Sequence, residues 1–169
     1  MRFSIQVLTL VLSFSATALG APVSKRALTE QAYNDFQVSG GVAGDALAEV
    51  NANFPIDVND LANVSANDLD IISSAAQISE QAEVATGGFN DALEGVTGDA
   101  KTVLQAGKIK NKVLKLQTDV LRLQIQAAQG KTGLDAQISQ QEKKLATNVA
   151  IDEEAAGQAS SAIDFAGSD

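Results

Sequence analysis

The 169-residue sequence contains no cysteine, no histidine and no tryptophan. The absence of cysteine excludes disulfide bonds, zinc knuckles, iron–sulfur clusters and thiol catalysis. The absence of histidine removes the commonest general base, the Ser-His-Asp relay and metal ligation by imidazole. Carboxylates, lysines, hydroxyls and one tyrosine remain for chemistry. We therefore expect a protein that is not an enzyme and that carries no cofactor.

Two acidic segments, 57–60 and 68–70, bring carboxylates close together in the sequence. Neither has the spacing of a calcium loop, because Leu61 and Ile72 stand at ligand positions and no glycine lies where the loop must turn. We expect no metal site.

The first residues have the pattern of a secretory signal peptide. Arg2 supplies a positive charge, and a short apolar stretch diluted by polar residues ends in small residues near residue 20. This stretch is too short and too interrupted for a transmembrane segment, so residues 1–20 are predicted to be a signal peptide. Residues 21–26 form a propeptide that ends in the dibasic pair Lys25-Arg26. Unless that pair occurs by chance, the mature chain begins at Ala27. We expect residues 27–169 to form a single helical domain that is secreted and extracellular, without a transmembrane segment.

The charges of the mature chain fall into three blocks. Nine basic residues stand against 21 acidic ones, a net charge near −12, which disfavours nucleic acid and anionic membranes as partners. Residues 27–100 hold 13 acidic residues and no Lys or Arg, residues 101–144 hold all nine bases, and the remaining tail is acidic again. The chain is thus acidic, basic and acidic in turn.

Almost every segment between turn signals has helical composition, and no sustained period-two pattern is present. We expect an all-α helical bundle. Shorter helices are predicted around Tyr33 and Phe36, from about residue 42 to 53, and from a cap at Ser65 to about residue 86.

The strongest structural signal is a long antiparallel helical hairpin, with arms at about 99–129 and 133–164. Apolar residues of the first arm alternate steps of three and four over three heptads, which predicts a seam for another helix. Further apolar residues beside this seam favour burial in a bundle over an isolated coiled coil. The seam consists of Ala106, Ile109, Val113, Leu116, Val120, Leu123 and Ala127, and the residues beside it are Leu114, Leu121 and Ile125.

Lys101, Lys108, Lys115 and Arg122 are each seven residues apart and form one stripe along the predicted first arm. The stripe has two explanations. In the structural explanation, the stripe is a solvated face or pairs internally with the acidic half of the chain. In the functional explanation, it is a docking strip for an anionic partner such as a lipid head group, an acidic polysaccharide or a protein. Nucleic acid is disfavoured, because the basic block lacks aromatic side chains on which bases could stack.

Two further features bear on function. Asn63 begins an Asn-Val-Ser sequence, the only N-glycosylation sequon in the chain, in a loop before a predicted helix. The many alanines, such as Ala75 and Ala82, permit close helix contacts, and alternatively leave an apolar groove for a fatty chain. A lipid- or hydrophobic-surface-binding carrier or coat protein is therefore the alternative to a protein-binding function.

The propeptide ends in Lys25-Arg26, and four segments of the mature chain stand out beside it: 33–39, 44–51, 107–115 and 155–160. Together they resemble a family of cysteine-free small secreted proteins of filamentous ascomycete fungi, for which no established biochemistry can be carried over. The resemblance implies a fungal origin, a dibasic convertase that cuts after Arg26, and a role at the wall, in the medium or against a host. The expected function is non-enzymatic binding at the cell surface or on a host target, effector-like or wall-associated.

Overall fold

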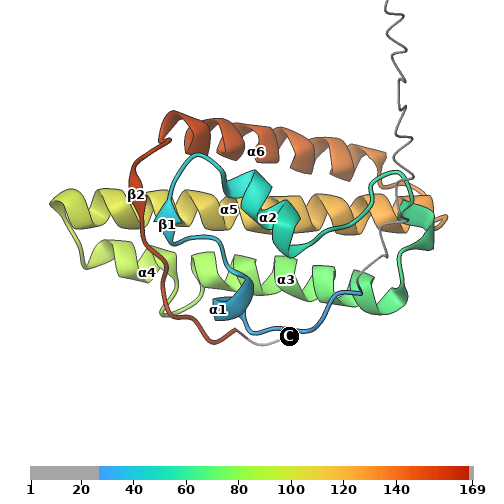
Figure 1. The fold of residues 1–169 in the computed structure, drawn as a ribbon, viewed down its shortest axis with the longest axis horizontal. Coiled ribbons are helices and arrows are strands. Elements are labelled where there is room, and N and C mark those ends of the chain that lie inside the picture. The colour runs from blue at the N-terminus through green and yellow to red at the C-terminus, as the bar shows by residue number, and fades with distance from the viewer. Residues whose placement is uncertain (1–26, 168–169) are drawn as a thin grey trace, which may run out of the picture.

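A computed structural model describes residues 27–167. The predicted signal peptide 1–20 and the propeptide 21–26, including Lys25 and Arg26, lie outside the described residues. The described chain is a helical bundle with one small antiparallel sheet, so the all-α prediction is confirmed (Figure 1). Its elements are α1 (Tyr33–Phe36), β1 (Gly41–Val42), α2 (Ala46–Asn53), the 3-10 helix η1 (Leu61–Asn63), α3 (Ala66–Val84), α4 (Phe89–Glu94), α5 (Gly98–Ala128), α6 (Asp135–Glu154) and β2 (Ala159–Ser160).

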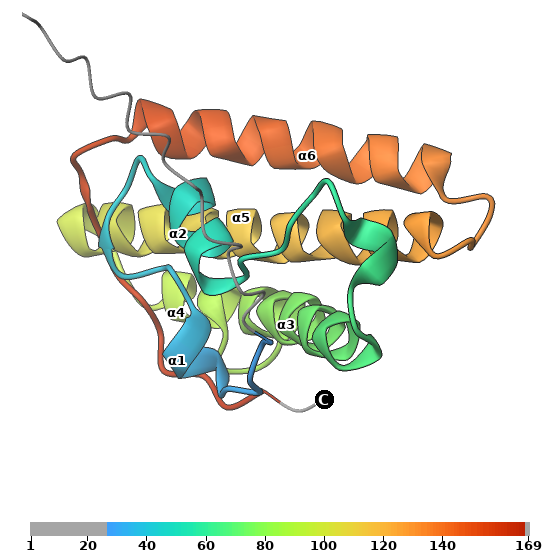
Figure 2. The same ribbon diagram turned by 45° about the vertical axis from the view of Figure 1, so that its right-hand side comes forward.

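The two longest helices form the predicted antiparallel hairpin. α6 lies alongside α5 over most of its length (Figures 1 and 2). The turn between them uses Gly130 and Gly133 at φ angles of +99° and +79°, which favour glycine. The first arm agrees with the prediction to within a residue at each end.

The second arm is shorter than predicted, because α6 ends at Glu154 and not near residue 164. Gly157 follows with φ +84°, a conformation that stops a helix. The chain then pairs with β1 as an antiparallel strand, with Gly41 opposite Ser160. These pairing bonds replace the helical ones, so the prediction of helix over 155–164 is wrong.

The last described residues, 157–167, form a C-terminal strap that runs from the end of α6 past α5 to α1 (Figure 1). At the crossing, the Ser161 amide donates to the Val103 carbonyl of α5 at 3.1 Å. The crossing requires Gly107, because a Cβ atom there would lie 1.9 Å from the Ser161 carbonyl oxygen. Further on, Phe165 meets the ring of Tyr33 edge to face at 5.9 Å.

α5 is the centre of the bundle, with α3 and α6 on opposite sides of it and α2 packed against both α5 and α6 (Figures 1 and 2). Five of the seven predicted seam residues are buried, and Ile109 and Ala127 are half-buried. The residues beside the seam, Leu114, Leu121 and Ile125, are buried as well and face the main core with α1, α2 and α3. This breadth of burial confirms that α5 belongs to a bundle and not to an isolated pair of helices.

Three polar residues of α5, Lys110, Asn111 and Thr118, lie fully buried, and the first two bond to other segments of the chain. The Lys110 ammonium donates to the Gly40 and Val42 carbonyls at 3.0 and 2.9 Å and forms an ion pair with Glu49 at 2.9 Å. Asn111 accepts a hydrogen bond from the Tyr33 hydroxyl at 2.8 Å and donates one to a carbonyl of α3. These bonds tie the N-terminal segments to the central helix.

The predicted cap at Ser65 is confirmed, since its hydroxyl accepts a hydrogen bond from the Asp68 amide at 3.0 Å at the start of α3. The helix predicted from about residue 42 begins later, at Ala46. Residues 41 and 42 are taken up in β1, and the Ala46 amide donates to Asp152 of α6 at 2.9 Å. The Asp152 carboxylate of α6 thus accepts a hydrogen bond from the first turn of α2.

Candidate functional site: the charged groove between α3 and α6

A groove of about 890 Å³ follows α5 between α3 and α6, on the part of the α5 surface that neither helix covers. All three helices contribute polar side chains to it. The principal lining residues are Gln77, Glu80 and Glu83 of α3, Lys112, Lys115, Asp119 and Arg122 of α5, and Gln141, Lys144 and Asn148 of α6.

The floor of the groove is one face of α5. Lys112, Lys115, Asp119, Arg122 and Gln126 recur at steps of three and four residues, so they lie along the same side of the helix. The apolar residues of α5 occupy the sides that pack on α3, α2 and α6. Because the apolar sides of α5 pack against these helices, the charged side of α5 remains to line the groove.

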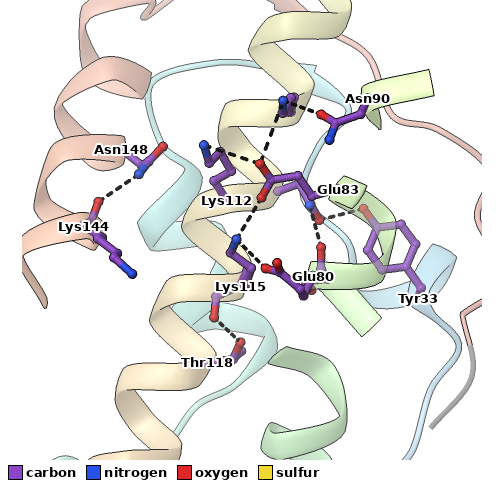
Figure 3. Close-up of polar contacts among 12 residues, drawn as sticks. Tyr33, Glu80, Glu83, Asn90, Lys112, Lys115, Thr118, Lys144 and Asn148 are labelled. Atoms are coloured by element: carbon purple, nitrogen blue, oxygen red, sulfur yellow. Dashed lines mark hydrogen bonds and ion pairs between the residues drawn. The ribbon is translucent and has the colours of Figure 1, made fainter. Parts of the chain in front are cut away.

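Glu83 of α3 is the centre of the ion cluster in the groove. Its side chain is 10% exposed and lies among three lysines of α5: the Lys115 ammonium at 2.8 Å, Lys112 at 3.5 Å and Lys108 at 3.9 Å. Figure 3 shows Glu83 reaching toward α5 beside Lys112 and Lys115. A second carboxylate, Glu80, contacts Lys115 at 2.5 Å. The cluster thereby links α3 to α5 with charge-assisted hydrogen bonds.

These contacts shift the ionisation of both partners. Burial by itself would raise the pKa of Glu83, but the hydrogen bond and charge of Lys115, with the charges of Lys112 and Lys108, outweigh it and lower that pKa. Burial would likewise lower the pKa of Lys115, but Glu80 and Glu83 outweigh it and raise that pKa. Both groups are therefore held in their charged forms.

The cations of the groove divide into two kinds. Arg122 is paired within its own helix, where its guanidinium donates two hydrogen bonds to Asp119 at 3.0 and 2.6 Å. Lys112 is 31% exposed and only loosely paired with Glu83. Lys144 of α6 is exposed and forms no ion pair within the described part of the chain. Lys112 and Lys144 are thus the cations that a ligand in the groove can reach.

The structure distributes the predicted basic stripe among different surroundings. Lys108, Lys115 and Arg122 share the α3-facing side of α5, and each has a partner in this chain. Lys108 contacts Asn90 and Glu83, and Lys115 contacts Glu80 and Glu83. Arg122 pairs with Asp119. Lys101 is exposed and lines a separate depression beside Ile109 and Ile151. Lys108 and Lys115 therefore follow the first explanation of the stripe, in which its cations pair with the acidic half of the chain. Lys110, which lies between Lys108 and Lys115 in the sequence, is fully buried.

Sequence reasoning did not single out Glu80, Glu83 or Lys144. The two glutamates are three residues apart in a half of the chain without any basic residue, a signal that they need partners from elsewhere. The sequence does not show which of the nine basic residues pair with these two glutamates. Lys144 joins the groove only because α6 folds back along α5.

The predicted glycosylation residue Asn63 is exposed at the end of η1. Its side-chain amide donates to Asp60, and the Ser65 hydroxyl of the sequon caps α3. The asparagine nitrogen is therefore at the surface, and a glycan there stays a prediction.

Comparison with known families places the whole helical region in one unit. Residues 28–164 match the model of a domain of unknown function, DUF8454. The chain belongs to this family. No curated protein and no solved structure matches it. The DUF8454 domain contains every helix described above, and the groove lies entirely within it.

Two negative findings concern residues 27–167 only. Among the helices of this region, none has both the length and the hydropathy that a membrane span needs. Within the same region, no three acidic residues gather closely enough to hold a metal ion.

Proposed function

We propose that this chain is a secreted, non-enzymatic fungal protein that acts by binding a partner at the cell surface or on a host target, as an effector or a wall-associated component. The signal-peptide pattern and the fungal resemblance support the location. The lack of histidine and cysteine supports binding over catalysis.

The groove between α3 and α6 is the binding site in this proposal. The observation that carries it is the pair of reachable cations, Lys112 and Lys144, on facing helices of a chain whose mature net charge is near −12. An anionic partner that approaches this chain is repelled over most of the surface and is attracted locally at the groove.

The charges of the groove have separate tasks. Glu83, Glu80 and Lys115 are paired with one another and hold α3 on α5, so they determine the width of the groove. Lys112 on the floor, formed by α5, and Lys144 on the side formed by α6 contact the partner. The amides of Gln77, Gln141 and Asn148 add hydrogen-bonding groups between them.

The partner that best suits this lining is an acidic segment of another protein. Among residues 27–167, none of those that line the groove is aromatic, so they offer no ring on which nucleobases could stack. A groove along a helix, with polar groups on both sides, accepts an extended or helical peptide with carboxylates on one face.

The test uses the mature chain 27–169 and a fluorescent polyglutamate peptide as the probe. We expect K112E/K144E to weaken peptide binding at least tenfold, with a steep dependence on salt for the wild type. The matched control K131E/K143E makes the same charge change at two exposed lysines outside the groove and should leave binding close to wild type.

Equal loss in both variants would mean that net charge alone drives binding and would remove the groove from the proposal. Stronger competition by an acidic polysaccharide or by anionic vesicles than by the peptide would contradict a protein partner. Secretion and processing are tested separately, by the intact mass of the protein from culture medium, which should begin at Ala27.

A further inference from the structure

A second concavity, of about 490 Å³, lies between the N-terminal segment 27–31, the end of α2 and the first half of α3. It shares no lining residue with the groove, because Asp70, Ile71 and Ile78 lie on another side of α3. Its size is within the range of small-molecule sites.

The floor of this pocket is apolar. Phe36, Phe54 and Ile78 are buried members of the hydrophobic core, and the two rings meet edge to face at 5.7 Å. Leu28 and Ile71 are half-buried and pack against the same core. The pocket can therefore take an aliphatic or aromatic body of modest size and remove it from water.

The rim of the pocket is polar, and among residues 27–167 the only ionisable side chains that line it are acidic. Glu30 and Asp70 are exposed at the rim, and neither takes part in an ion pair or side-chain hydrogen bond within residues 27–167. No lysine or arginine occurs anywhere from residue 27 to residue 100. The local field at the pocket is therefore negative.

The walls of the pocket are held in place by hydrogen bonds. The Leu28 amide donates to Asp68 at the start of α3 at 2.8 Å, which fixes the N-terminal segment. The side-chain amide of Asn53 donates to the Phe36 carbonyl at 2.8 Å, which fixes the end of α2. A ligand thus enters a formed site and does not need to order it.

We propose that this pocket binds a small amphipathic cation, a protonated or quaternary amine with an aliphatic or aromatic body. The body packs on Phe36, Phe54 and Ile78, and the ammonium lies between Glu30 and Asp70. Cleavage after Arg26 would add one α-ammonium at Ala27, which leaves two carboxylates against one cation at the rim. A fatty acid with an aliphatic chain as long as that of the amine is repelled by the carboxylates of Glu30 and Asp70. This inference does not depend on the proposed function of the groove.

The test is titration of the mature chain with octylammonium and with octanoate, followed by NMR chemical-shift changes and calorimetry. We expect octylammonium to shift the signals of Phe36, Phe54 and Ile71, and octanoate to bind at least tenfold more weakly. E30Q/D70N should weaken octylammonium binding about tenfold. The control E94Q/E154Q, which neutralises two exposed acids outside the pocket, should not.

A third variant, S74L, fills the pocket from α3 and should abolish the shifts, provided that circular dichroism shows the helical content unchanged. E30Q/D70N should still bind polyglutamate, because the groove is intact, so failure of one proposal is distinguishable from failure of the other. Equal binding of octanoate, or an equal loss in E94Q/E154Q, would overturn the inference, as would the absence of binding by either probe. Preferred binding of octanoate would instead favour a fatty-chain carrier.

Discussion

Lys115 of α5 donates a hydrogen bond of 2.8 Å to the carboxylate of Glu83 of α3, across 32 positions of sequence. The basic block and the acidic half of the chain, separate in the sequence, therefore meet along the contact between two helices. Much of the positive charge that the sequence presents as a surface stripe is used to hold α3 in place. In the groove itself, the cations that remain accessible are different ones, Lys112 and Lys144.

Removal of either partner of this ion pair should destabilise the fold. K115M leaves the nearly buried carboxylate of Glu83 with only its more distant lysines, and we expect a loss of about 2 kcal/mol in the free energy of unfolding. E83Q should cost about 1–2 kcal/mol. A double-mutant cycle by urea denaturation should give a coupling of about 1 kcal/mol, whereas additive losses would show that the pair does not contribute as a unit.

The ion pair also predicts a dependence of stability on pH. The pKa of Glu83 is lower in the folded chain than its ordinary value of 4.5, so its contribution is present above that value and is lost as the pH falls through the folded pKa. The pKa of Lys115 is raised above 10.5, so its contribution is complete below that value and is lost as the pH rises through the folded pKa. Thermal unfolding from pH 7 to pH 3 should show a smaller loss for E83Q than for wild type, and identical slopes would contradict this.

Tyr33 provides an internal probe of folding, because it is the only tyrosine of the chain. Burial raises its pKa to about 12. The folded state thus favours the protonated hydroxyl of Tyr33. The stability that this contributes is complete below pH 10 and is lost as the pH rises from about 10 toward the pKa of Tyr33 in the folded chain. Phenolate absorption at 295 nm should therefore appear about 2 pH units later in native protein than in urea, and coincident curves would show an exposed ring.

The buried Lys110 should be intolerant of substitution. K110M keeps most of the volume but removes three partners: the Gly40 and Val42 carbonyls and the Glu49 carboxylate. We expect destabilisation of about 2–3 kcal/mol, measured by chemical denaturation, with faster amide hydrogen exchange in β1. The exposed K131M is the matched control and should be neutral.

Gly107 is predicted to reverse the usual effect of replacing glycine by alanine in a helix, which stabilises by about 1 kcal/mol. An alanine Cβ there would lie 1.9 Å from the Ser161 carbonyl oxygen, so the C-terminal strap must shift. G107A should lower the melting temperature by several degrees. G95A, whose Cβ meets nothing closer than 3.9 Å, should be neutral or stabilising, and a neutral G107A would show that the strap is not tightly seated.

The elements themselves followed closely from local patterns. Steps of three and four between apolar residues predicted α5 to within a residue at each end, because helix periodicity is a property of neighbouring residues. The cap at Ser65 was predicted for the same reason, since its hydroxyl meets an amide only three residues away. In these two cases the determining contact is local and the prediction is confirmed, whereas no side chain caps the start of α1 or of α6.

The failures have a common cause in distant contacts. Residues 155–164 carry no helix-breaking proline and one local stop signal, Gly157. Beyond it they leave the helix because Ser160 pairs with Gly41 and Phe165 meets Tyr33, each more than 100 positions away. Lys110 has the same residue type as the half-buried Lys108 and Lys112 on either side of it, and the loop at Gly40 and Val42 provides the carbonyls that allow it to be fully buried.

By itself the sequence determined the helical class, the long hairpin and the separation of charge into blocks, because composition and periodicity act through neighbours along the chain. The tertiary structure alone decided which lysines pair with Glu83, where α6 ends, and that a groove and a separate acidic-rimmed pocket exist. Those features depend on where helices cross. A crossing is set by the packing of whole faces, which no short stretch of residues contains.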